Sequence, residues 1–93
     1  MKCERIRYTQ HAFTRMIERG NSPDQVYEIV TSGEIIEDYP DDKPYPSVLL
    51  LGHAQDKILH AVVARDPVAG DCYIVTVYMP DTTIWSDDFR KRR

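Results

Sequence analysis

Three basic side chains follow one another at four-residue spacing near the start of the chain: His11, Arg15 and Arg19. On an α-helix this spacing places them in one stripe beside the apolar face. Like charges four residues apart repel each other by about 0.2–0.5 kcal/mol unless an anion lies against them. That anion could be a bound phosphate, which arginine holds with paired hydrogen bonds. It could equally be a carboxylate of the same chain, such as Glu37 or Asp38, and on residue types alone pairing within the chain is the commoner outcome.

A second candidate is His60, which lies between apolar neighbours in a strand-like run. Because imidazole titrates near neutral pH, this residue could be a general acid or base, or a half-buried structural group. Which side chains lie beside His60 depends on the register of the next strand. With even residue sums, as in 60 with 78, its face also carries Cys72, Ile74, Thr76 and Tyr78, whereas with odd sums it faces Val75 and Val77. The six-residue connection from Asp66 to Asp71 allows either register.

Other catalytic signatures are missing from the sequence. Three histidines and two cysteines form no CxxC, HxxxH or HExxH spacing, so we expect no metal ion. There is no GxxxxGK, GxGxxG or GxSxG motif either, which argues against nucleotide hydrolysis, acyl transfer and a bound cofactor. The two cysteines, Cys3 and Cys72, form no multi-bridge framework, and the charged start does not read as an export signal. We therefore expect a cytoplasmic protein without a disulfide and without a membrane span.

Length and charge limit the organisation of the chain. With 93 residues it should hold one domain, spanning residues 1–93. The net charge is −3, but residues 1–19 carry a net +3, the last four residues +4, and the segment between them −10. A polyanion would therefore have to contact the N-terminal element and the C-terminal tail.

The candidate residues must be positioned by two helices in the first third of the chain. The first should begin after Thr9, a good N-cap, and end before Gly20. The second should run from Ser22 to Gly33, with Ser22 and Gln25 forming a capping box. Because the link is short, we expect an αα-hairpin whose apolar faces cover one side of a common layer.

After the helices the hydrophobic period becomes that of strands. Residues 34–39 should form an edge strand, and residues 48–54, 58–65 and 72–79 should form consecutive hairpins, while Arg5 to Tyr8 could be a strand or an extended arm. Trp85 and Phe89 are four residues apart, so we expect a short helical turn there that docks on the domain, followed by a frayed basic tail at 87–93. The fold class is therefore α+β, with two N-terminal helices packed on a mainly antiparallel sheet of about four strands.

Several of these segments resemble one family. His11 to Gly20 follows the pattern H-A-x-x-R-M-x-E-R-G, and later landmarks occur in order at 38–40, 46–52, 59–64 and 74–80. Across roughly residues 8–86 this set is similar to the small bacterial proteins called domain of unknown function 4258. The positions that match its motifs are His11, Arg15, Arg19, His60, Thr76 and Tyr78.

The resemblance implies a RelE-like element order and a place in a toxin-antitoxin system. RelE-like toxins are ribonucleases, and the expected partners are RNA and a cognate antitoxin, commonly of the zinc-finger type. This chain departs from that pattern because such toxins tend to be basic.

Our leading hypothesis is a metal-independent endoribonuclease in which the ribose 2′-hydroxyl attacks the adjacent phosphate. The catalytic residues would be His60, Tyr78 and Arg15, and the substrate-binding residues would be His11, Arg19 and Thr76. The alternative is a non-catalytic adaptor that binds a protein partner, with the strand from Glu34 to Tyr39 open to β-addition.

Overall fold

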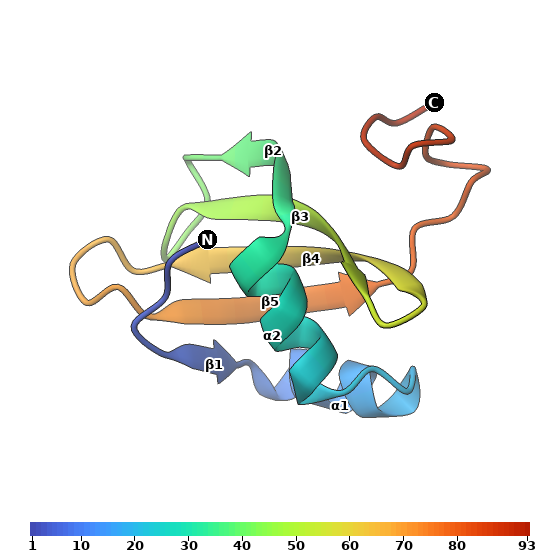
Figure 1. The fold of residues 1–93 in the computed structure, drawn as a ribbon. Coiled ribbons are helices and arrows are strands. Elements are labelled where there is room, and N and C mark those ends of the chain that lie inside the picture. Colours follow the sequence, from blue (N-terminus) through green and yellow to red (C-terminus); the bar gives the residue numbers. More distant parts are fainter.

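The protein, described over all residues 1–93 by a computed structural model, is a five-stranded sheet with two helices on one face (Figure 1). The strand order is β1-β5-β4-β3-β2, in which β1 is parallel to β5 and the other pairs are antiparallel. The elements are β1 (Ile6–Tyr8), α1 (Gln10–Glu18), α2 (Pro23–Ser32), β2 (Glu34–Tyr39), β3 (Ser47–Ala54), β4 (Lys57–Arg65) and β5 (Cys72–Tyr78). The α+β class is therefore confirmed, with β2 at one edge of the sheet as expected.

Local sequence signals set the boundaries of the two helices. The Thr9 hydroxyl accepts a hydrogen bond from the Ala12 amide at 3.0 Å and caps α1. Gly20 follows that helix with φ of 72°, a left-handed conformation that glycine adopts without steric cost. At the start of α2, Ser22 and Gln25 exchange the two hydrogen bonds of a capping box. These four signals were all readable in the sequence.

The two helices cover different strands. Helix α1 packs mainly on β5, whereas α2 packs on β3 and β4. The core between helices and sheet includes fully buried Met16, Ile29, Leu50 and Ile74. Gly52 allows α2 to approach β3 closely, because a Cβ at that position would lie 2.6 Å from the Ile29 Cδ1 atom. The expected common helical layer is present, and each helix covers its own part of the sheet.

The sheet has one strand more than the four or so expected, because β1 joins it. The Cys72 amide donates to the Arg5 carbonyl at 2.8 Å, and the Thr9 amide donates to the Ile74 carbonyl at 3.4 Å. A disulfide between Cys3 and Cys72 fastens the same segment. The expectation of no disulfide is thus wrong for this structure: the two cysteines are 69 residues apart in sequence, and only the β1 and β5 pairing brings them together.

The register between β4 and β5 combines both alternatives left open by the sequence. His60 is opposite Tyr78 and Val62 is opposite Thr76, which are even sums. A β-bulge follows, so that Val63 is opposite Ile74. His60 therefore shares its face with Thr76 and Tyr78, while Cys72 and Ile74 lie in the core under the helices.

The C-terminal segment folds back on the molecule. Trp85 is only 3% exposed and forms an isolated bridge with Arg92. The Trp85 amide donates to the Asp81 carbonyl, and the Arg93 amide donates to the Ile84 carbonyl. Residues 79–93 contain turns and a bridge but no helix, so the expected helical turn is absent although Trp85 does dock. The prediction that the tail frays is therefore wrong, because its residues are tied to the chain that precedes them. Neither α1 nor α2 is long and apolar enough to cross a membrane.

Candidate functional site

His60 lies on the face of the sheet opposite the helices and is completely buried. Its Nε2 is 2.8 Å from the carbonyl oxygen of Phe89, and its Nδ1 is 3.1 Å from the Tyr78 hydroxyl. A carbonyl can only accept, so Nε2 carries the proton and Nδ1 of the neutral ring accepts from Tyr78. Burial lowers the pKa of His60 and raises the pKa of Tyr78. Both groups are therefore uncharged at neutral pH.

The C-terminal segment covers this histidine. The ring of Trp85 meets that of His60 edge to face, with centroids 4.5 Å apart. The Arg92 guanidinium lies 4.9 Å from the centre of the Trp85 ring, and it pairs with the Glu37 carboxylate at 4.0 Å. The C-terminal segment thus shields His60 from solvent, and the ion pair between Arg92 and Glu37 attaches the same segment to β2.

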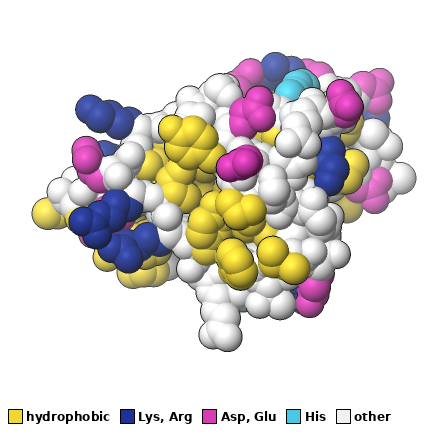
Figure 2. All heavy atoms as spheres, turned by 60° about the horizontal axis from the view of Figure 1, so that its bottom comes forward, with side chains coloured by type: hydrophobic (Ala, Val, Ile, Leu, Met, Phe, Trp, Pro, Cys, Tyr) yellow, Lys and Arg dark blue, Asp and Glu magenta, His cyan; other side chains and the backbone are white.

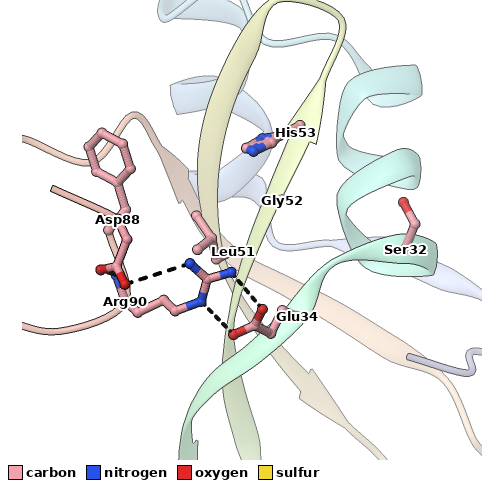
Figure 3. A pocket seen from close by; sticks show the side chains of 8 residues that line it. Ser32, Glu34, Leu51, Gly52, His53, Asp88 and Arg90 are labelled. Atoms are coloured by element: carbon pink, nitrogen blue, oxygen red, sulfur yellow. Dashed lines mark hydrogen bonds and ion pairs between the residues drawn. The ribbon is translucent and has the colours of Figure 1, made fainter. Parts of the chain in front are cut away.

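A second contact holds the tail on β2. Arg90 donates two hydrogen bonds of 2.9 Å to the Glu34 carboxylate, and its guanidinium also lies 3.7 Å from Asp88 (Figure 3). These three residues line a cavity of about 340 Å³ with His53 and Ser32, whose side chains come from β3 and α2. Because Arg90 already pairs with the acids there, this cavity offers an anion no free arginine.

The basic stripe on α1 has no carboxylate partner. Arg15 and His11 are exposed and make no side-chain hydrogen bond or ion pair. Arg19 donates from Nη1 to the Val77 carbonyl at 2.6 Å. Glu37, expected as an internal partner, instead accepts from the Tyr39 hydroxyl and pairs with an arginine of the tail. The stripe is therefore open to an external anion.

The predicted site residues fall into two groups. His60, Thr76 and Tyr78 lie together on the back of the sheet, and the stripe lies on α1, which packs against the other face. Arg19 is the nearest link between the groups, because it contacts the carbonyl of a β5 residue that lies between Thr76 and Tyr78. In the described conformation the two groups do not form one catalytic cluster.

A cavity of about 390 Å³ on the back of the sheet contains residues that the sequence did not single out as a site. Tyr73 and Val75 of β5 line it together with Tyr45 of the loop before β3. The rings of Tyr45 and Tyr73 are stacked, with centroids 5.5 Å apart and planes at 18°. Nothing local marks this pair, because one tyrosine lies within a proline-rich loop and the other occupies an ordinary strand position.

Hydrophobic side chains also reach the surface near α1. Figure 2 shows them gathered in the middle of the side that carries β1 and α1, with the largest group of Lys and Arg side chains at the left of the view. On α1 itself, Phe13 is 45% exposed and Ile17 is 60% exposed, one helical turn apart. Adjacent exposed apolar side chains of this kind are typical of contact surfaces.

Comparison with known proteins gives one match. Residues 8–79 match a family described as Domain of unknown function (DUF4258). No curated protein matches the chain. No solved structure matches it either.

Proposed function

Because the chain belongs to the domain of unknown function 4258 family, whose description assigns no activity, we propose its function from its own geometry. The protein is a metal-independent endoribonuclease and the toxin of a bacterial toxin-antitoxin system, acting in the cytoplasm. The observation that carries this proposal is the exposed stripe on α1, in which Arg15 and His11 have no partner within the chain. The order of two helices before a series of antiparallel strands supports a RelE-like relationship.

The stripe contains the groups that the reaction needs. In the cleavage, the 2′-hydroxyl loses its proton and its oxygen bonds to the neighbouring phosphorus. The bond from phosphorus to the 5′-oxygen then breaks, and that oxygen takes up a proton, leaving a cyclic phosphate. Arg15 and Arg19 would stabilise the charge on the phosphoryl oxygens, His11 would accept the proton of the 2′-hydroxyl as the exposed imidazole of the stripe, and water would protonate the leaving 5′-oxygen.

His60 and Tyr78 enter this mechanism only if the tail leaves. Both ring nitrogens of His60 are engaged, and its side chain has no contact with solvent. A phosphate could reach it only after the segment carrying Trp85 and Phe89 had moved. While the tail covers His60, we therefore propose that cleavage takes place at the stripe on α1. The role of His60 is then to hold the tail in place.

Induction of the protein in a bacterial culture tests this function. We expect growth arrest and loss of intact cellular RNA with the natural sequence. Arg15→Ala should abolish both effects, while Arg5→Ala should leave them, because Arg5 is also an exposed arginine but lies outside the stripe. Normal growth with intact RNA, at comparable levels of folded protein, would overturn the toxin proposal.

The exposed apolar pair on α1 favours a second candidate, a non-catalytic adaptor. Phe13 and Ile17 could bury their side chains against a protein partner such as a cognate antitoxin, for which we propose a zinc-finger type. The edge strand β2 is less available than expected, because Glu34 and Glu37 are held by arginines of the tail. An adaptor would bind its partner through α1 and cleave no RNA.

A further inference from the structure

The back of the sheet is covered at one end and hollow at the other. The tail covers the end that carries His60. At the other end, Ser47, Ala64 and Tyr73 are register partners on neighbouring strands and form the floor of the 390 Å³ cavity. The loop before β3 adds Tyr45 to the lining, and its ring stacks on that of Tyr73. The cavity is therefore built from three strands and a loop, and its lining includes a stacked aromatic pair.

The lining has the chemistry of a site for a planar ring. Both tyrosines are half-buried, and Val75 beside them is 40% exposed. The polar groups among the lining residues include the Lys43 ammonium, the Thr9 hydroxyl and the Asp42 carboxylate, which accepts a hydrogen bond from the Ser47 hydroxyl. Aromatic side chains next to a cation are the usual means of binding unpaired nucleobases, because every base has a face that can stack. The volume is also within the range of small-ligand sites.

Thr9 connects the cavity to the basic stripe along the chain. This residue lines the cavity and also caps α1, two residues before His11. Arg15 lies six residues beyond Thr9 along the helix, which corresponds to a rise of about 9 Å. A single strand that leaves a base in the cavity therefore needs only a few nucleotides to bring a phosphate to Arg15.

We propose that this cavity holds one nucleobase of single-stranded RNA, stacked on the outer face of the Tyr45–Tyr73 pair, and is the base-recognition subsite of the enzyme. The inference rests on the proposed ribonuclease function and specifies its substrate as unpaired RNA. An apolar peptide side chain is the competing occupant. The cations on α1 and Lys43 favour the nucleic acid, because they would stabilise phosphates on either side of the bound base.

Binding of a short fluorescein-labelled single-stranded RNA, measured by fluorescence anisotropy in chelator, tests the subsite. Tyr45→Ala should weaken binding about 10-fold, the usual effect of losing one stacked base. Tyr45→Phe, which keeps the ring, should bind like the natural protein. Tyr27→Ala is the matched control, because Tyr27 is an exposed tyrosine on α2 that does not line the cavity.

A second series replaces one base at a time in the same RNA by an abasic sugar. The natural protein should lose about 10-fold in affinity at one position, and Tyr45→Ala should lose nothing further there. If RNA binds and Arg15→Ala weakens it while Tyr45→Ala and every abasic RNA bind as before, the subsite is wrong and the RNA-binding stripe stands. If no RNA binds to the natural protein, both the subsite and the proposed function are wrong.

Discussion

His60 donates a hydrogen bond of 2.8 Å from Nε2 to the carbonyl oxygen of Phe89, and this contact joins the middle of the sheet to the C-terminal segment. Because Nδ1 must then accept from the Tyr78 hydroxyl, the ring is fixed as one neutral tautomer. The tail therefore closes around the histidine for which the sequence predicts a catalytic role.

Acidification should destabilise the fold through His60. Burial lowers its pKa below the ordinary 6.5, with the hydrogen bond to Phe89 and nearby Glu37 acting in the opposite direction and Arg92 adding to the decrease. Below about pH 6.5 the unfolded chain binds a proton that the folded chain does not, so stability falls as pH decreases through that value and is fully present above it.

Thermal unfolding followed between about pH 5 and 7.5 measures this effect. His60→Gln should flatten the decrease in Tm, whereas His53→Gln should not, because His53 is an exposed histidine. A decrease of the same size in His60→Gln as in the natural protein would show that another group is responsible.

Removing the indole should open the tail. Trp85 is 3% exposed and lies against His60, so Trp85→Ala should cost about 3 kcal/mol of unfolding free energy. It should also raise the pKa of His60 toward its ordinary value, since solvent would reach the ring. Urea unfolding and an NMR titration of the imidazole measure the two effects. An unchanged, still lowered pKa in a folded variant would mean that burial by the tail is not its cause.

Reduction of the disulfide should weaken the attachment of β1. The bridge between Cys3 and Cys72 encloses a long loop, with a sequence separation of 69, so its loss should cost about 4 kcal/mol in the chain-entropy account. Urea unfolding with and without dithiothreitol measures this, and Cys3→Ser should not respond to the reductant. Identical unfolding of the natural protein in both conditions would indicate free thiols, the state that a reducing cytoplasm favours.

The two arginines of the stripe should differ in what they do. Arg15 has no partner, so Arg15→Ala should weaken RNA binding, lower the slope of log affinity against log salt by about 0.7, and leave Tm unchanged. Arg19 caps the Val77 carbonyl, so Arg19→Ala should lower both RNA affinity and Tm. Salt titrations and thermal unfolding of the two variants make the comparison. A decrease of Tm in Arg15→Ala would show that its side chain supports the fold.

The local features of this fold were predictable from sequence. Thr9 and Ser22 mark helix starts by capping chemistry that acts within three residues, and both helices were located from it. The basic stripe was also predictable from local sequence, because helical spacing alone places Arg15 one turn after His11 on the same side of the helix. Whether a carboxylate of the same chain pairs with the stripe was not predictable. Glu37 is taken by Arg92 of the tail, and this pairing depends on how the tail folds back.

The remaining features depend on contacts between distant residues. The bulge after Val62 changes the register in the middle of a hairpin, and a six-residue connection cannot specify it. The attachment of the tail rests on the backbone carbonyl of Phe89, an acceptor that every residue type has. The stacking of Tyr45 on Tyr73 likewise needs the loop to close over β5, which no local pattern encodes.

Cleavage of single-stranded RNA by the purified protein in excess chelator is the most direct test of the central claim, that the basic stripe on α1 is a ribonuclease site. We predict cleavage products ending in a cyclic phosphate, a decrease of about 100-fold or more in rate for Arg15→Ala, and a rate close to the natural one for Arg5→Ala. Intact RNA after incubation with the natural protein, or equal rates for Arg15→Ala and the natural protein, would contradict the account.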